Sequence, residues 1–258
     1  SAVEEYRFRL VDFFDRLLAI LKEEKDYHSF WLDGQVVPLE DVAAVWPERM
    51  AEIENAVRAK KILVGPWYVL ADQMLVGGEP CVRNLLKGMR MAARYGQDNR
   101  IGYVPDNFGQ MSQLPQLLLG FGIDNAIFWR GYRLDAIDAA ETWMTGADGS
   151  RIRVVCLTAG YSNARGVTED APESFDRLDL MMPRMMQFCA SGTLLIMNGI
   201  DHALPTPNLP GVCAAIERRY PGVRPRHGSL AEYLAAASIK ARFGDLEAAE
   251  GADLVRLV

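Results

Sequence analysis

The stretch from Ile101 to Gly131 constrains the fold most, because it contains a strand, a polar turn, a helix and a second strand in quick succession. The apolar run 101–104 stops at Pro105, whose ring cannot continue a strand ladder. Residues 113–119 place leucines on one helical face, and the apolar segment 125–129 is typical of a buried strand. This order of elements predicts a mostly parallel sheet.

Two charged side chains follow the strands of this segment. Asp106 comes directly after the first strand and its proline, and Arg130 comes directly after the second. In β/α domains the loops that leave the carboxyl ends of parallel strands meet at one edge of the sheet, where the chemistry is usually found. We therefore expect Asp106 and Arg130 at one site. Taken alone, Asp106 fits a turn or helix-capping aspartate better than a catalytic one.

The rest of the chain continues the alternation of helices and strands. The patterns predict helices over 4–21, from 39 onward, and over 48–61, 82–93, 174–189, 209–220 and 229–237. They predict strands over 29–32, 62–64 and 193–197, a further one near 223, and a hairpin of strands around residues 147–150. Ser229 and Glu232 have the spacing of a capping box for the last helix.

Composition narrows the class of protein. The chain has 258 residues, half of them apolar, which suffices for one sizeable core and fits a single α/β domain over residues 1–258. A net charge of −6 speaks against a nucleic-acid partner or an anionic membrane surface. No apolar run approaches the roughly 18 residues that a membrane span needs. Four scattered cysteines without C-x-x-C spacing are typical of reduced thiols, so we expect a cytoplasmic protein; homo-oligomer formation stays open.

Further candidate residues stand where other predicted strands end. Asp33 opens the turn D-G-Q after the strand 29–32, and Trp67 follows the strand 62–64 in the sequence G-P-W-Y. Tryptophan is most often a core residue, yet sugar sites favour aromatic faces against a pyranose ring. Asp72 is a candidate for binding sugar hydroxyls. Tyr161 follows the hairpin and fits either a substrate contact or plain loop structure.

The motifs of this chain resemble those of a known family. The segment 102–123, GYVPDNFGQMSQLPQLLLGFGI, resembles the G-Y-x-P-D-x-F-G-x-x-x-Q-x-P-Q-x-L-x-G-F-G-I pattern of bacterial members of glycoside hydrolase family 38, the zinc-dependent retaining α-mannosidases. The sequences D-G-Q, G-P-W-Y-V and N-G-I-D-H, the last at residues 198–202, are also similar to family features. The resemblance covers nearly the whole chain, and it corresponds to the middle of a much longer enzyme.

The resemblance implies roles for individual residues. Asp106 matches the family's nucleophile, which is also a zinc ligand, and Arg130 matches the arginine that steadies the site. Asp201 matches the candidate general acid/base, and its neighbour His202 is expected to orient it or to bind sugar. Trp67, Asp72, Phe108 and Tyr161 are the further substrate-binding candidates. The implied substrate is a mannoside or a mannose-containing oligosaccharide, and the implied fold is an incomplete seven-stranded β/α barrel of the glycoside hydrolase and deacetylase type.

The chain also departs from the family pattern. Family members begin with a strand that ends in H-x-H-W-D, which supplies two zinc ligands, and continue into a segment H-D-S-I-C-G that supplies another; neither has a counterpart here. At residues 71–73 the chain reads A-D-Q where the family usually has P-D-E. We therefore expect that the parent enzyme binds zinc and hydrolyses α-mannosides, whereas this chain alone neither holds zinc tightly nor turns over substrate.

A pair of carboxyl groups favours a glycosidase, and two other functions, a deacetylase and a binding fragment, remain alternatives. Retaining glycosidases need one ionised carboxylate and one protonated carboxyl about 5 to 5.5 Å apart, and Asp106 with Asp201 supplies the two groups. A metal-dependent deacetylase on a related barrel would need ligands such as H-x-x-x-H, and the three histidines contain no such pair. A carbohydrate-binding fragment without catalysis is the non-enzymatic alternative. The sequence leaves the mannoside linkage open.

Overall fold

The computed structural model describes residues 2–237 and 245–247, with side chains described from residue 4 to residue 237. Its α-helices are α1 (Ala2–Glu23), α2 (Val37–Val45), α3 (Met50–Arg58), α4 (Gly78–Arg94), α5 (Leu114–Gly120), α6 (Asp176–Phe188), α7 (Leu209–Arg219) and α8 (Leu230–Ala237). Its strands are β1 (Phe30–Trp31), β2 (Ile62–Leu63), β3 (Gly102–Val104), β4 (Asn125–Phe128), β5 (Glu141–Thr145), β6 (Arg151–Cys156) and β7 (Asp245–Glu247). Short 3-10 turns η1 (Pro47–Arg49), η2 (Leu134–Ala136) and η3 (Pro172–Phe175) complete the order.

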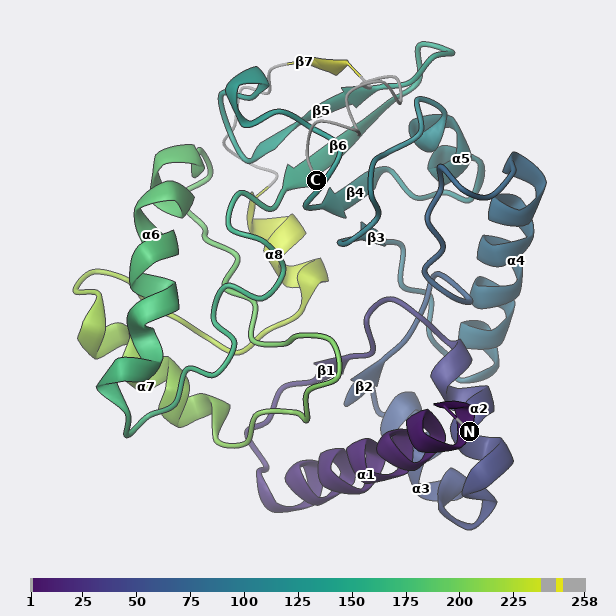
Figure 1. Ribbon diagram of the computed structural model, residues 1–258, viewed down its shortest axis with the longest axis vertical. Coiled ribbons are helices and arrows are strands. Elements are labelled where there is room, and N and C mark those ends of the chain that lie inside the picture. Colours follow the sequence, from purple (N-terminus) through teal and green to yellow (C-terminus); the bar gives the residue numbers. More distant parts are fainter. Residues whose placement is uncertain (1, 238–244, 248–258) are drawn as a thin grey trace.

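The strands form two separate sheets. The smaller contains β1 and β2 in parallel, and the larger has the order β3-β4-β6-β5-β7. Within the larger sheet β3, β4 and β6 run parallel, β5 is antiparallel to β6 as the predicted hairpin requires, and β7 is parallel to β5. Figure 1 shows the larger sheet above β1 and β2, with α4 and α5 on one side and α6 and α7 on the other. The predicted mixed α/β fold with mostly parallel pairing is confirmed, but the described strands do not form a closed barrel.

Two predicted strands are absent from the described residues, because their backbone groups bond to other partners. Residues 193–197 and the region near 223 have irregular structure. In the first of these, Met197 donates its N–H to the side chain of Asn163 (2.9 Å) and accepts from the N–H of Ala164 (3.0 Å). The Asn163 amide also donates to the carbonyl oxygen of Leu195 (3.3 Å). A side chain therefore replaces the ladder that the apolar sequence suggested.

The last helix begins as its sequence predicts. Ser229 donates its backbone N–H to the carboxylate of Glu232 (2.7 Å), and Glu232 donates its own N–H to the Ser229 hydroxyl (3.3 Å). This reciprocal pair is the capping box expected from the spacing of the two residues. It satisfies backbone donors that a helix start otherwise leaves without partners.

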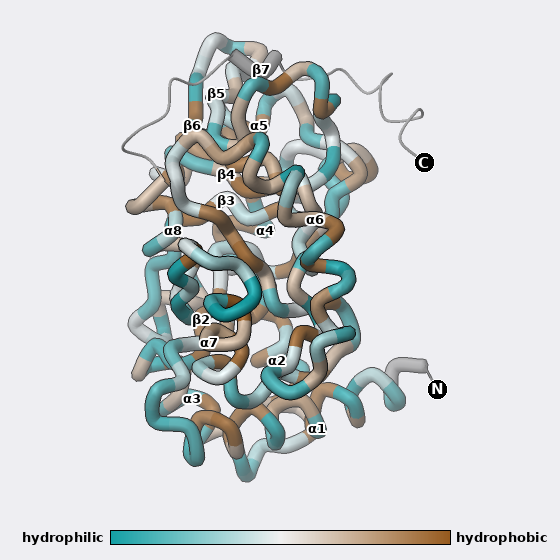
Figure 2. The backbone as a smooth tube through the Cα atoms, turned by 90° about the vertical axis from the view of Figure 1, so that its left-hand side faces the viewer, coloured by the Kyte–Doolittle hydropathy of each residue, from teal (hydrophilic) through white to brown (hydrophobic). Residues whose placement is uncertain are grey.

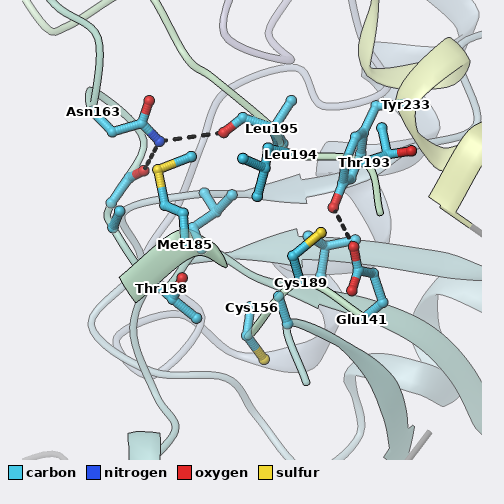
Figure 3. A pocket seen from close by; sticks show the side chains of 15 residues that line it. Glu141, Cys156, Thr158, Asn163, Met185, Cys189, Thr193, Leu194, Leu195 and Tyr233 are labelled. Carbon is cyan, nitrogen blue, oxygen red and sulfur yellow. Dashed lines mark hydrogen bonds between the residues drawn. The ribbon is translucent and has the colours of Figure 1, made fainter. Parts of the chain in front are cut away.

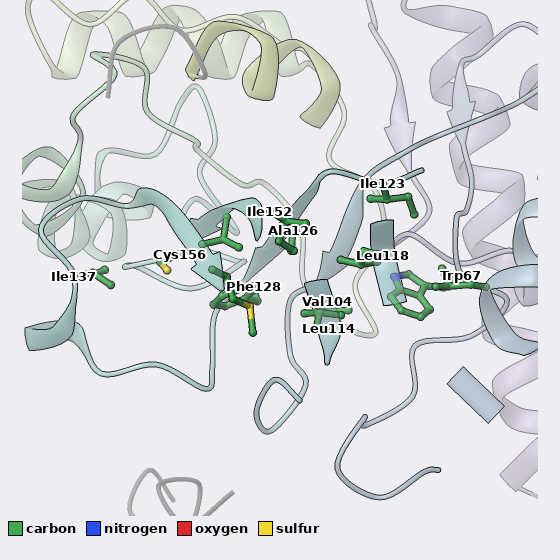
Figure 4. Packing of buried hydrophobic residues seen from close by; sticks show 13 residues of the cluster. Trp67, Val104, Leu114, Leu118, Ile123, Ala126, Phe128, Ile137, Ile152 and Cys156 are labelled. Atoms are coloured by element: carbon green, nitrogen blue, oxygen red, sulfur yellow. The ribbon is translucent and has the colours of Figure 1, made fainter. Parts of the chain in front are cut away.

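Apolar residues alternate with polar ones along most helices, as the tube in Figure 2 shows by its changing colour. One core cluster joins β3, β4, β5 and β6 to α4, α5 and the loop after β2. Its members include Val104, Leu114, Phe128, Ile152 and Trp67, all at most 3 % exposed. Figure 4 shows Trp67 at one end of this cluster, beside Leu118.

None of the helices within residues 2–237 is long and apolar enough to cross a bilayer.

A buried carboxyl fastens α8 and the irregular segment to the large sheet. Glu141 on β5 is 3 % exposed, and its Oε1 accepts hydrogen bonds from the hydroxyls of Ser191 (2.8 Å) and Tyr233 (2.9 Å). Figure 3 shows this group at a small cavity of about 30 Å³, roughly the space of one water molecule, with Leu194 and Leu195 opposite. Glu141 thus holds three distant parts of the chain together.

Candidate active site

The parallel pairing of β3 and β4 places Asp106 beside Arg130. Val104 is the register partner of Phe128, so the two strands end at the same level. Just beyond them, Trp129 donates its backbone N–H to the carbonyl oxygen of Pro105 (3.1 Å). The Arg130 guanidinium then donates through Nε to Asp106 Oδ1 at 2.7 Å. The structure therefore brings together the two charged residues expected at this edge.

The loop that carries Asp106 is held tightly against the loop after β4. Gly131 has a φ of +87°, and a Cβ at this position would lie 2.8 Å from the backbone nitrogen of Gln110, so only glycine fits. The buried Gln110 accepts a hydrogen bond from Gln73 (3.2 Å) and lies 3.4 Å from the carbonyl oxygen of Arg130. Gln73, where the family usually has glutamate, therefore acts here as a neutral amide in a buried chain of hydrogen bonds.

Tyr161 bonds to one candidate carboxyl and is influenced by the other. Its phenol donates a hydrogen bond to Asp201 Oδ2 at 3.0 Å. Burial, the bond to Asp201 and the charge of Asp106 together raise the pKa of Tyr161 well above its usual range. Asp201 lies in the irregular segment, not at the end of a strand, because the predicted strand before it does not form. Both Asp106 and Asp201 therefore act on this phenol.

A third carboxyl belongs to the same site. Asp33, in the turn after β1, is partly buried, and its Oδ2 accepts a hydrogen bond from Gln35 (3.0 Å). Burial raises the pKa of Asp33 to about 7, and the negative charges of Asp201 and Asp106 add to this effect. Both charges act on Asp33, so all three carboxyls share one electrostatic environment.

Several of these residues line a large open cavity of about 1510 Å³. Asp33, Tyr161 and Asp201 lie on its wall with Tyr103, a fully buried phenol whose pKa burial raises strongly. His202 also lines this cavity; it is exposed, has a φ of +60°, and its ring lies 5.7 Å from that of Tyr6. A cavity of this size accommodates a sugar ring and part of its aglycone.

Three predicted substrate contacts have different surroundings. Phe108 is 57 % exposed, and its ring centre lies 4.8 Å from the Arg130 guanidinium carbon, which places it beside Asp106. Trp67 is 3 % exposed and packs in the core, so its position favours a packing role over a sugar contact. Asp72 accepts the N–H of Met74 (3.2 Å) in a local turn and does not line the large cavity.

Sequence reasoning assigned no role to three residues that the structure brings to this site. Asp33 was recognised only as the start of a strand-end turn, and its position after a strand was the available signal. Tyr103 and Trp129 stand inside predicted strands, where an aromatic residue usually indicates core. The sequence pattern gave no sign that the side chains of Tyr103 and Trp129 would lie at the site.

The residues at this site do not by themselves fit a zinc ion. Among the described side chains, 4–237, no three histidine, cysteine, aspartate or glutamate groups are arranged to hold a metal. Asp106 Oδ1 is paired with Arg130, and the nearby donors are carboxyls and a phenol, whereas protein zinc sites normally hold three or four ligands that include histidine or cysteine.

These features define a class of protein, an α/β domain with several carboxyl groups in one electrostatic environment beside a large open cavity, as glycosidases have. Comparison with known families agrees. Residues 1–251 match the model of the glycosyl hydrolases family 38 N-terminal domain, and the chain belongs to this family.

Relatives of known or provisional name support the same membership. A Halalkalibacterium halodurans protein provisionally named mannosylglycerate hydrolase is 31 % identical over 243 residues, covering 90 % of this chain and 27 % of the relative. Human alpha-mannosidase 2C1 is 30 % identical over 137 residues, covering 51 % of this chain and 13 % of its own length. The crystal structure of an alpha-mannosidase from Enterococcus faecalis V583 superposes with a TM-score of 0.88 at 28 % identity, covering 94 % of this chain and 28 % of that one. The chain thus spans little more than a quarter of its long bacterial relatives.

The raised pKa of Asp33 predicts a pH-dependent cost in stability. A folded-state pKa of about 7 against an ordinary value of 3.8 means that the folded protein binds more protons, so stability falls as pH rises between these values. Asp33→Asn keeps an acceptor for Gln35 and tolerates the φ of +47°. In EDTA-treated protein we expect this variant to exceed wild type by about 2–4 kcal/mol in free energy of unfolding at pH 8, and to match it at pH 4. Urea unfolding at both pH values measures this; an equal difference at pH 4 and pH 8 contradicts it.

Proposed function

We propose that this chain is the N-terminal catalytic part of a retaining α-mannosidase. Its membership of family 38 and its likeness to proteins named for mannoside hydrolysis support this substrate class. We further propose that the two sheets are arcs of one incomplete barrel, which further polypeptide closes in the longer enzyme. The surroundings of β1 support this idea: Phe30 and Leu32 donate their N–H groups toward β2, and both strands line the large cavity.

The arrangement of Asp106, Tyr161 and Asp201 is the observation that carries the proposal. The Tyr161 phenol bonds to Asp201, which lines the large cavity, and the negative charge of Asp106 acts on the same phenol. A retaining glycosidase needs two carboxyl groups about 5 to 5.5 Å apart, close enough for one to attack while the other transfers a proton. A phenol on which both carboxyls act suits that geometry.

In the proposed reaction, Asp106 attacks the anomeric carbon and Asp201 protonates the departing glycosidic oxygen. The bond from the sugar to the leaving group breaks as the bond to Asp106 forms, which gives a covalent glycosyl-aspartate. Asp201, now ionised, then takes a proton from water, which attacks the same carbon and releases Asp106; two inversions give retention. The Arg130 guanidinium pairs with Asp106 and fixes its orientation through the 2.7 Å bond.

Substrate contacts follow from what lines the cavity and its mouth. We propose that His202 binds sugar hydroxyls beside Asp201, and that the exposed ring of Phe108 contacts the apolar side of the sugar next to Asp106. The family's zinc would need ligands beyond Asp106, which we assign to polypeptide outside this chain. The mannosylglycerate named for one relative belongs on the panel of substrates to be tested.

Asp33 is the competing candidate for the proton donor. Its pKa of about 7 gives it the property that a general acid needs near neutral pH, a carboxyl that is still partly protonated. Asp201 has the advantage of exposure to the cavity, where a leaving group can reach it. Kinetics separates the two residues.

We expect Asp106 and Asp201 variants of the longer natural polypeptide to fail in different ways. Asp106→Asn loses the nucleophile, so kcat/KM should fall by at least about 10³-fold for every mannoside. Asp201→Asn should cost about 10²–10⁴-fold with alkyl mannosides but far less with a dinitrophenyl mannoside, whose leaving group needs no proton. Asp33→Asn is the matched control. Dependence on the leaving group in Asp33→Asn, with none in Asp201→Asn, would reverse the assignment of the proton donor.

We also expect residues 1–258 on their own to bind no stoichiometric zinc and to show no turnover. A single carboxylate paired with an arginine is a weak zinc ligand, and a second and third ligand have to come from elsewhere. Metal analysis after dialysis, with a single-turnover assay on an activated aryl mannoside, measures both quantities. Stoichiometric zinc together with turnover contradicts the expectation. Mannose binding without turnover, in the longer polypeptide as well, would instead favour the carbohydrate-binding alternative.

A further inference from the structure

Trp129 is the one aromatic residue of the site that touches the partners of both candidate catalytic carboxyls, among the contacts described for residues 4–237. Its indole lies 4.3 Å from the guanidinium carbon of Arg130, which bonds to Asp106. The same ring meets the phenol of Tyr161 edge to face, with centroids 5.5 Å apart, and that phenol bonds to Asp201. Two separate chains of contact therefore meet at one side chain.

The surrounding backbone fixes the position of this ring. Trp129 directly follows β4 and donates its N–H to the carbonyl oxygen of Pro105, the residue before Asp106. On its other side, Gly160 has a φ of +75°, and a Cβ there would already lie 3.5 Å from the indole. The loop before Tyr161 thus lies against the indole. A ring held in this way can transmit its position to the groups packed against it.

Phe108 provides a natural contrast. Its ring also packs on the Arg130 guanidinium, at 4.8 Å, so that Arg130 lies against two aromatic rings. Among the ring contacts described for residues 4–237, Phe108 packs on Arg130 and not on Tyr161, whereas Trp129 packs on both. Loss of either ring should loosen Arg130, but only loss of Trp129 should also disturb Tyr161.

We propose that Trp129 is a positioning residue that fixes Arg130 on Asp106 and Tyr161 on Asp201 at the same time. The inference rests on the proposed function only in treating Asp106 and Asp201 as the catalytic pair. The positioning itself is a property of the folded chain and can be measured without any turnover. An indole suits this role because its face attracts the guanidinium and its edge packs against a second ring.

The direct test is NMR of residues 1–258 with two reporters. The first is the Nε–H of Arg130, assigned with Arg130→Lys, whose exchange with water reports its bond to Asp106. The second is the labelled Cζ of Tyr161, assigned with Tyr161→Phe, with Asp201→Ala giving its chemical shift when the bond to Asp201 is lost.

In Trp129→Leu we expect exchange of the Arg130 Nε–H to rise at least about 10-fold and the Tyr161 Cζ resonance to move at least half-way to its position in Asp201→Ala. Trp129→Phe, which keeps an aromatic face, should hold the Arg130 exchange rate within about 3-fold of wild type. Phe108→Leu should change Arg130 alone. Trp143→Leu is the matched control, because Trp143 also lies against an arginine, Arg151 at 5.1 Å, but on the hairpin strand β5; it should change neither reporter.

Two results overturn the proposal: both reporters unchanged in folded Trp129→Leu, or Phe108→Leu moving Tyr161 as far as Trp129→Leu does. If the leucine variant does not fold, Trp129→Met carries the same test. In the longer polypeptide, Trp129→Leu should lower kcat about 10- to 100-fold with KM within about 3-fold, as expected when only alignment is lost. The reporters could shift as expected in Trp129→Leu while the wild-type longer polypeptide hydrolyses no mannoside. That result would reject the proposed function and leave the positioning role of Trp129 intact.

Discussion

The site depends on the parallel register of β3 and β4. Because Val104 lies opposite Phe128, the two strands end together, and Asp106 and Arg130, each two residues beyond its strand, become neighbours. Their ion pair is partly exposed, with side chains 40 % and 31 % accessible, so it adds little to stability, on the order of 0–1 kcal/mol. Its importance is geometric. A guanidinium that lies against two aromatic rings and bonds through one nitrogen holds a carboxylate in one orientation.

Like charges give the site a second constraint. The negative charges of Asp201 and Asp106 act on Asp33 and, together with burial, raise its pKa. A single cation, Arg130, pairs with one of the three carboxyls in the contacts described. Natural active sites often hold such unfavourable charge clusters, because a substrate or cofactor relieves them. We expect this chain on its own, without the further polypeptide of its longer relatives, to lose stability as the pH becomes alkaline, because the carboxyl cluster is then fully charged.

Much of the arrangement could be predicted from the sequence where local rules decide it. Pro105 and the apolar runs fixed the ends of β3 and β4, so Asp106 and Arg130 were placed correctly from pattern alone. The capping box of Ser229 and Glu232 formed as expected, since both partners lie within one turn. The family resemblance added the role of Asp201, whereas the predicted strand over 193–197 that leads to it does not form.

Other features could not be predicted because long-range contacts decide them. The apolar residues 193–197 read as a strand, but Asn163, some thirty residues earlier, supplies the hydrogen bonds that a neighbouring strand would otherwise supply. The packing of Trp67 in the core and of Trp129 against Arg130 depends on which neighbours each strand-end tryptophan meets.

The assignment of Asp106 as nucleophile is tested most directly by covalent trapping. The longer polypeptide is treated with a fluorinated mannosyl fluoride that forms the intermediate but releases it slowly, and its peptides are mapped by mass spectrometry. We predict one sugar attached to Asp106; a sugar attached to Asp33 or Asp201, with Asp106 unmodified, would contradict the account.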